Sequence, residues 1–186
     1  MLLGDIGGTN IRLRLIQVTP GFEQPTKEYK TDKLKMDDHP TFEGAIETFL
    51  KDAEVRPKVA VIAIAGPVKE NTVRMSNAEK WGDLVGNKMA ETFKFEHFIF
   101  LNDFEAAAYG ASVLGEEEVI HINNVPLHQD KVKAVVGPGT GLGTAMLYPA
   151  PFRNRLRNYV IPGEGGHVNF GPSCDLEWEF YNFVRK

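Results

Sequence analysis

The chain has 186 residues, of which 42% are apolar and 25% charged, and its formal net charge is -4. This mild acidity, without basic clusters, argues against nucleic acid as the main partner. No apolar run is long enough to cross a bilayer, and Asp5 introduces a charge too early for a secretory signal. The single cysteine, Cys174, excludes an internal disulfide and supports no structural zinc site. We therefore expect a cytoplasmic protein with no membrane partner.

The first segment, residues 2–18, predicts a β-hairpin. A short apolar strand over 2–6 leads into the turn Gly-Gly-Thr-Asn at 7–10, and apolar and charged residues alternate from residue 11 onward. The turn is unusual because Asp5 precedes it and because Thr9 and Asn10 end it. Glycines occur in tight hairpins because they adopt positive φ, but they also let backbone N–H groups approach an anion. The turn is therefore interpreted either as an ordinary hairpin or as a phosphate-binding loop.

Strand and helix patterns alternate over residues 27–96. We expect a third strand around Tyr29 and a helix that Asp37, Asp38 or Thr41 caps and that runs to about Val55. The β-branched run at 58–65 is typical of a central strand buried on both faces. We further expect a short strand over 73–77, an anchoring role for Trp81, and a helix that starts at Asp83 and continues to Phe93.

An aromatic-rich apolar run begins at His97 and ends in Asn102 and Asp103, and an alanine-rich segment over 105–114 follows. This pattern predicts a buried strand that places both side chains at its carboxyl end, where a helix begins. Ligands bind at that end of the strands in open α/β sheets. Asparagine and aspartate also cap helices often, so the pair is interpreted either as a helix cap or as a substrate site in which Asp103 is a base.

The pattern changes after Gly115, and we place a domain boundary there, with one domain over 1–114 and the start of a second over 115–186. Strands expected at 132–136 and 144–148 flank a second glycine turn at 137–143, and a third strand is expected at 158–161. The repeated Gly/Thr turn suggests two duplicated domains that face one another. The element order predicts an α/β fold with a mixed sheet, flanking helices and an incomplete second domain.

The last two segments of the chain contain a glycine-rich turn with two polar residues and a helical pattern. Glu164 and His167 lie among three glycines, in a turn that either binds vicinal hydroxyls or is an ordinary surface loop. Residues 175–186 have helix-spaced apolar side chains with nothing after them to pack on, so we expect a fragment of a longer protein. Neither glycine turn matches a P-loop, and the second one lies between two strands, which excludes a Rossmann site.

Four motifs in this order resemble the bacterial-type glucokinase family of the hexokinase/actin superfamily, with shorter similarities at 64–67 and 75–77. They are Gly4-Asp5-Ile6-Gly7-Gly8-Thr9-Asn10, Leu101-Asn102-Asp103-Phe104, Gly139-Thr140-Gly141-Leu142-Gly143 and Pro162-Gly163-Glu164-Gly165-Gly166-His167-Val168. The resemblance spans the chain and implies an actin-like ATPase (ribonuclease H-like) fold. It implies phosphorylation of D-glucose at the 6-hydroxyl by ATP and Mg²⁺, a step of glycolysis, in an enzyme that is a homodimer when complete.

The resemblance also implies roles for individual residues. Asp103 matches the catalytic base, and Asn102, Asp103, Glu164 and His167 match glucose ligands. Two loops match the loops that bind the ATP phosphates in this family. Asp5 matches a residue near the magnesium, which it would bind directly or through water. The loop positions are Asp5, Gly7, Gly8, Thr9, Asn10, Gly139, Thr140 and Gly141.

Two departures from related families matter. Related repressor/ORF/kinase sugar kinases carry a zinc-binding cysteine cluster, and only Cys174 follows His167 here, so we expect no zinc. The family continues past residue 186 with its adenosine-binding segment, so we expect the chain alone to be inactive. Alternatives are a non-catalytic sugar-binding regulator of the same fold, or a kinase for another hexose or phosphoryl donor.

Overall fold

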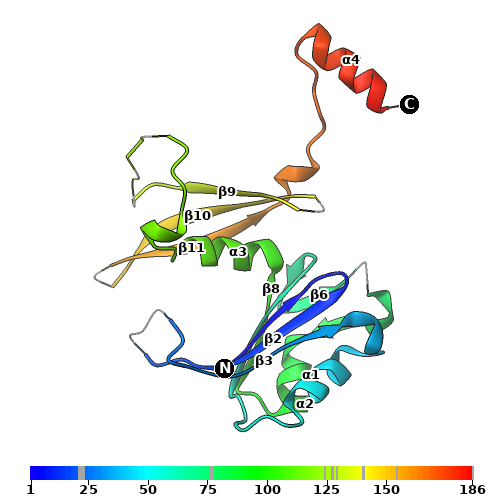
Figure 1. Cartoon of the computed structure of the whole chain (residues 1–186), viewed down its shortest axis with the longest axis vertical. Helices are drawn as coiled ribbons and strands as arrows, with labels where there is room; N and C mark the ends of the chain where they lie inside the picture. The colour runs from blue at the N-terminus through cyan, green and yellow to red at the C-terminus, as the bar shows by residue number, and fades with distance from the viewer. Residues whose placement is uncertain are drawn as a thin grey trace.

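The computed structural model describes residues 1–20, 24–75, 78–123, 125–126, 128, 130–139, 141–153 and 155–185. Apart from the terminal helix, the helices and strands form two lobes with helix α3, Asp103–Ala111, between them (Figure 1). Within the described ranges, no helix is both long and apolar enough to span a membrane.

The first lobe is built on a five-stranded mixed sheet in the order β3-β2-β1-β4-β8. Strand β1 pairs antiparallel with β2 and parallel with β4, which in turn pairs parallel with β8. The expected hairpin, the third strand and the strands at 58–65 and 97–102 are confirmed. The burial expected for these last two strands is wrong, because β4 fully buries only every second residue and β8 leaves His97 and Ile99 exposed. The bounds of the five strands are Leu2–Ile6 for β1, Asn10–Gln17 for β2, Lys27–Lys35 for β3, Val59–Ile64 for β4 and His97–Asn102 for β8.

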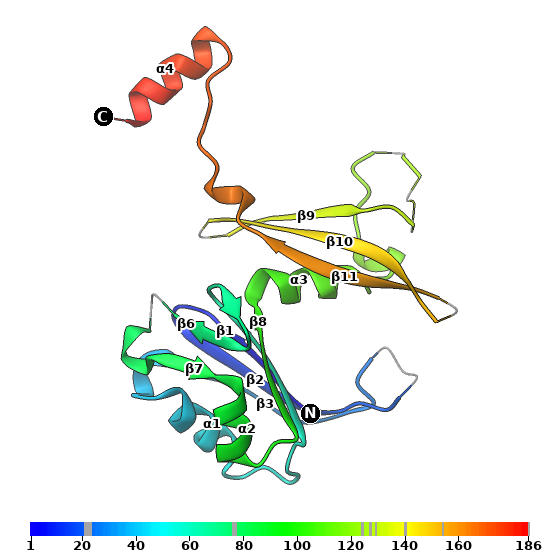
Figure 2. The same ribbon diagram turned by 180° about the vertical axis from the view of Figure 1, so that it is seen from behind.

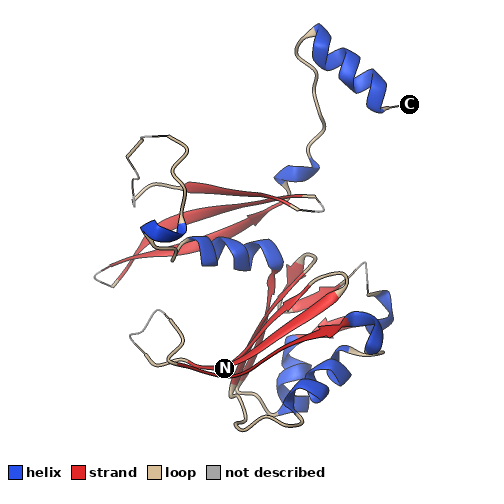
Figure 3. Ribbon diagram, viewed as in Figure 1, coloured by secondary structure: helices blue, strands red, loops and turns tan. Residues whose placement is uncertain are grey.

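Two helices, α1 (Phe42–Leu50) and α2 (Gly86–Phe93), lie on one face of this sheet (Figure 3). Between helices and sheet, Phe42 packs against Phe100 and Trp81, with ring centroids 5.8 and 5.7 Å apart. The Trp81 Nε1 donates a hydrogen bond to the His39 carbonyl at 3.2 Å. Trp81 is buried, so its expected role as an anchor is confirmed. Single-turn 3-10 helices lie at Met36–Asp38, Glu79–Trp81, Glu116–Glu118 and Gly165–His167.

Two expected boundaries in this lobe are wrong. Helix α1 begins after its cap Thr41 but ends at Leu50 instead of about Val55, and Ala53 and Val55 pack against the core from the segment that follows the helix. The expected helix start at Asp83 is strand β7, Asp83–Val85, which pairs with β6, Thr72–Arg74. Strand β5, Val68–Lys69, completes this small antiparallel sheet. A local pattern does not show this pairing, because the partner lies about ten residues away. Residues 76–77 of the expected strand lie outside the described residues.

The second lobe is an antiparallel sheet in the order β11-β10-β9, with Lys133–Pro138 in β9, Leu142–Phe152 in β10 and Arg155–Gly163 in β11. Helix α3 packs on one face of this sheet, where Ala108 contacts Ala145 and Leu147. The division at 114/115 stays a prediction, and α3, which precedes it in sequence, packs on the second sheet. The expected terminal helix is confirmed as α4, Asp175–Val184, at the end of an extended segment (Figure 2).

Candidate active site

The carboxyl ends of three parallel strands meet at one edge of the first sheet. Ile6, Ile64 and Asn102 are register partners across β1, β4 and β8. The chain therefore leaves all three strands side by side, into the first glycine turn, the Ala65-Gly66 turn and the start of α3. In the first turn, Gly7 N–H donates to the Asn10 carbonyl at 3.0 Å. This register explains why motifs about 95 residues apart lie together.

The side chain of Asn102 is the cap of α3. Its Oδ1 accepts from the backbone N–H groups of Phe104 and Glu105 at 3.0 and 3.1 Å. Its Nδ2 donates to the Gly66 carbonyl at 3.1 Å, so the same side chain fixes the turn after β4. The helix-cap interpretation is therefore confirmed for Asn102.

Replacing Asn102 with alanine is expected to lower the free energy of unfolding by about 0.5–2 kcal/mol, the usual cost of losing such a cap. Denaturant unfolding of the chain measures this loss. Asn102→Asp is the matched control, since it keeps the cap oxygen but loses the donor to Gly66, and it should fall between wild type and Asn102→Ala. An Asn102→Ala variant as stable as wild type would contradict the capping role.

Asp103 is the first residue of α3, and its side chain is exposed. Its Oδ1 accepts from the Phe104 N–H at 2.8 Å. Across the described residues its carboxylate makes no other hydrogen bond, so Oδ2 is open to a ligand. The positive end of the helix dipole stabilises a negative charge at this position.

The second glycine turn packs directly on the residue that follows Asp103. A Cβ atom on Gly143 would lie 2.3 Å from the Phe104 ring, and one on Gly137 would lie 2.6 Å from it. Real side chains never approach so closely, so both positions need glycine because of the Phe104 ring. The turn is closed by the Gly139 N–H, which donates to the Gly141 carbonyl at 2.7 Å. Thr140 lies outside the described residues.

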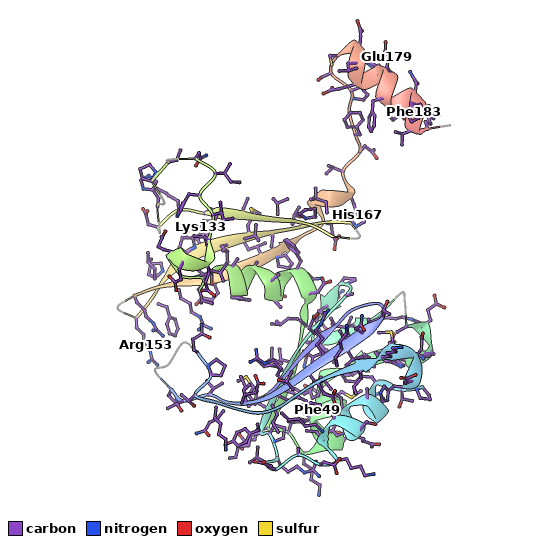
Figure 4. All side chains as sticks on the ribbon, viewed as in Figure 1. Phe49, Lys133, Arg153, His167, Glu179 and Phe183 are labelled. Carbon is purple, nitrogen blue, oxygen red and sulfur yellow. The ribbon has the colours of Figure 1, made fainter. Side chains whose placement is uncertain are left out.

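The turn that carries Glu164 and His167 is held by Thr144 of β10. The Thr144 Oγ1 accepts from the Gly165 N–H at 2.9 Å and donates to the Gly163 carbonyl at 3.1 Å. Glu164 and His167 are exposed and face each other, with Oε2 and Nε2 3.4 Å apart. Figure 4 shows His167 in its single-turn helix at the end of the second sheet. Sequence reasoning missed Thr144, because no local signal links it to a turn 19 residues later.

A cleft of about 700 Å³ joins these elements. The first turn contributes Gly7, Gly8 and Thr9 to its lining, and the strand-to-helix junction contributes Asn102 and Asp103. The second lobe contributes four further candidates to the same lining, namely Gly139, Gly141, Glu164 and His167. Phe104 and Thr144, which sequence reasoning had not selected, line it too.

Two predicted residues, Asp5 and Asn10, are not among the residues that line the cleft. The Asp5 carboxylate forms an ion pair with Arg12, with Oδ2 and Nη1 2.8 Å apart and both side chains about half exposed. Throughout the described part of the chain, no three His, Cys, Asp or Glu side chains are placed to hold a metal. Mg²⁺ typically takes only one or two carboxylates together with substrate phosphates and waters, and Asp5 fits that requirement as a single ligand near the first turn.

Glu105 lies beside the cleft and was not selected from the sequence. It lines a hollow of about 250 Å³ together with Pro67, Pro162 and Glu164, between the two lobes. Partial burial raises the pKa of the Glu105 carboxyl, and a hydrogen bond with the Asn102 backbone opposes that rise.

The family model described as "Glucokinase" matches residues 2–186. The chain belongs to the glucokinase family. It is 35% identical over 184 residues to a glucokinase of Escherichia coli, which covers 99% of the chain and 54% of that relative. It is 34% identical to a glucokinase of Ralstonia nicotianae over 100% of the chain and 52% of the relative.

Solved structures show the same fold. A glucokinase from an Antarctic psychrotroph superposes with a TM-score of 0.79 at 28% identity, over 99% of this chain and 56% of that one. A Balamuthia mandrillaris glucokinase, determined in complex with glucose, gives a TM-score of 0.65 at 23% identity over 99% of this chain and 52% of that one. The predicted mixed α/β, actin-like fold is therefore confirmed. The chain spans about half the length of the curated glucokinases it matches.

Proposed function

We propose that the complete protein transfers the γ-phosphoryl group of ATP to the 6-hydroxyl of D-glucose, giving glucose 6-phosphate and ADP. The observation that carries this proposal is the shared cleft, which both glycine turns, the Asn102–Asp103 junction and the Glu164–His167 turn line together. Membership of the glucokinase family supports the same reaction.

The sugar site is proposed where polar side chains of both lobes meet. Asn102 and Asp103 come from the first lobe's sheet edge, and Glu164 and His167 come from the turn fixed by Thr144. Carboxylate and imidazole groups bind vicinal hydroxyls by accepting and donating hydrogen bonds. Because the two pairs lie on different lobes, a bound sugar would draw the lobes together and exclude water that otherwise hydrolyses ATP.

Asp103 is proposed as the base that receives the proton of the 6-hydroxyl. Its Oδ1 is held by the Phe104 N–H, which leaves Oδ2 for the hydroxyl. Phosphoryl transfer has a loose transition state, so the protein mainly orients the nucleophile and neutralises charge. The carboxylate lies at the N-terminal end of α3, where the helix dipole favours negative charge, and a general base acts through such a group.

The phosphates are proposed to lie between the two glycine turns, with the backbone N–H groups of Gly7, Gly8, Gly139 and Gly141 as donors. Mg²⁺ would neutralise charge on the transferring group when bound. Asp5 is the residue proposed to hold it, directly or through water, once its carboxylate leaves Arg12. We also propose that Thr9, Asn10 and Thr140 belong to this phosphate site. For the complete protein we propose a cytoplasmic location and a homodimeric state.

A coupled assay on the complete polypeptide tests the proposal, with glucose, mannose and fructose as acceptors and ATP, ADP and polyphosphate as donors. Turnover with ATP that is greatest with glucose supports it. Greater turnover with another combination of acceptor and donor would assign a different sugar substrate or phosphoryl donor to the protein. Glucose-dependent thermal stabilisation without turnover with any pair would instead indicate a sugar-binding regulator.

The chain of residues 1–186 alone is expected to show no ordinary turnover, because half of the length of its relatives is absent from it. The same coupled assay, at high enzyme concentration and with the complete polypeptide as positive control, measures this. A turnover number within about tenfold of that of the complete polypeptide would contradict the expectation and show that the chain holds its own nucleotide site.

A further inference from the structure

The Phe104 ring lies over the base of the second glycine turn. Gly137 of β9 and Gly143 of β10 are register partners next to the pair that flanks the turn. At both glycines, the three atoms nearest to an added Cβ are ring atoms of Phe104. The ring therefore fills the space that side chains would take on this face of the sheet, as aromatic residues do over glycines in other sheets. The position of the turn depends on the position of this ring.

The backbone of the same residue orients two of the proposed sugar ligands. The Phe104 N–H donates to Oδ1 of Asn102 at 3.0 Å and to Oδ1 of Asp103 at 2.8 Å. Phe104 also lines the cleft, together with both of these residues. One residue thus contacts both halves of the candidate site. Its N–H holds the sugar ligands, and its ring supports the turn proposed to bind phosphate.

The packing around Phe104 leaves little room for the ring to move alone. The residue is half-buried and packs against the cluster that Ala108 forms with Ala145 and Leu147. Packed interiors contain few voids, so they transmit a displacement instead of absorbing it. A shift of the turn therefore moves the ring, and with it the N–H that orients Asn102 and Asp103.

We propose that Phe104 is a positioning residue that couples the phosphate site to the sugar site. A nucleotide phosphate held at the second turn would fix the Gly137–Gly143 pair, and hence the ring above it. The N–H of Phe104 would then hold Asn102 and Asp103 in the orientation that the sugar needs. By linkage, a bound sugar would tighten nucleotide binding by the same factor. This inference rests on the proposed function, because it requires both ligands to bind in the shared cleft.

A purely structural role for Phe104 predicts a different result. Loss of the ring would then lower stability and leave the effect of each ligand on the other unchanged. Phe95→Leu is the matched control for that role. The Phe95 side chain is 7% exposed, its ring packs on Phe98 in the first lobe with centroids 5.4 Å apart, and it does not line the cleft.

Calorimetry on the complete polypeptide tests the coupling without using turnover. Glucose is titrated with and without a saturating non-hydrolysable ATP analogue and Mg²⁺, into wild type, Phe104→Leu and Phe95→Leu. Coupling between two sites typically changes affinity by about 5- to 150-fold, so the analogue should tighten glucose binding by about fivefold or more in wild type and Phe95→Leu. In Phe104→Leu the same ratio should fall below about twofold, while each ligand still binds alone.

A double-mutant cycle tests whether the effect passes through the ring. Gly143 is not a proposed sugar ligand, and its φ is not positive, so alanine meets no backbone strain there. Gly143→Ala should nevertheless weaken glucose binding about tenfold, because the new Cβ displaces the Phe104 ring. In a Phe104→Ala background the ring is gone, and the same substitution should change glucose affinity by less than about twofold.

Three outcomes would overturn the inference and leave the proposed function standing. They are full coupling in Phe104→Leu, equal losses from Gly143→Ala in both backgrounds, and a wild type that binds both ligands without coupling. A wild type that binds no glucose, even without the analogue, would overturn the proposed function as well. Thermal unfolding shows whether each variant is folded. If Phe104→Ala does not fold, the comparison of Phe104→Leu with Phe95→Leu decides.

Discussion

Replacing Asp103 with asparagine is expected to lower kcat for glucose phosphorylation by about 10²–10⁴, the usual contribution of a general base. The amide oxygen of the introduced side chain keeps the hydrogen bond that Oδ1 now accepts from the Phe104 N–H. The amide nitrogen then faces the hydroxyl, where it is able to orient the sugar but not to accept a proton. Steady-state kinetics of the complete polypeptide measure kcat, and calorimetry measures glucose binding, which should change much less than kcat.

The outcome separates the two interpretations of this position. If Asp103 only stabilises the start of α3, then Asp103→Asn lowers thermal stability slightly through the helix dipole and leaves turnover intact. Asp175→Asn is a suitable control, since it also neutralises an exposed carboxylate in the first turn of a helix, α4, and Asp175 does not line the cleft. A kcat equal to that of wild type would rule out Asp103 as the base.

Replacing Gly166 with alanine is expected to weaken glucose binding by about tenfold to a hundredfold. A Cβ atom at this position would lie 1.9 Å from the Leu142 carbonyl oxygen and 2.8 Å from its carbon. These are backbone atoms of β10, so no side-chain rotation relieves the contact and the turn itself must move. Forced overpacking costs about 1–3 kcal/mol, and each 1.4 kcal/mol is about a tenfold change in affinity. Because Glu164 and His167 flank Gly166, the displacement removes both proposed sugar ligands from the cleft.

Glucose titration of the complete polypeptide by calorimetry gives the affinity, and thermal unfolding shows whether the fold survives. Gly171→Ala is the matched control, because nothing lies within 4 Å of a Cβ at that glycine, and it should match wild type in both measurements. Unchanged glucose affinity in Gly166→Ala would show that the Glu164–His167 turn does not bind the sugar.

Much of the local structure followed from the sequence. The alternation after Ile11 and the apolar run before Asn102 correctly predicted strands β2 and β8, because side-chain burial on a sheet follows the strand period. The cap residue Thr41 was among those predicted for α1, and its Oγ1 accepts from the Gly44 N–H at 3.1 Å. The helix start expected at 83 was wrong because strand β7 is stabilised by pairing with β6 rather than by local preference.

The site was predicted as a set of motifs and not as a geometry. Each motif is recognisable from residues that are adjacent in sequence, and these motifs contain the glycines, Asn102, Asp103, Glu164 and His167. The contacts that place them are long-range. Thr144 holds a turn 19 residues away, and the Phe104 ring sets the position of Gly137 and Gly143. Such contacts depend on which strands pair, and strand pairing is not encoded in any single segment.

The sequence by itself therefore determined the strand and helix segments around the site, the residue types that line it and the family to which it belongs. Only the tertiary structure decided that α3 packs on the second sheet, that Asp5 pairs with Arg12 outside the cleft lining, and that an apolar sheet face stays uncovered. The physical reason is that local pattern reports which face of an element is apolar. What covers that face depends on chain segments that are distant in sequence or belong to another part of the protein.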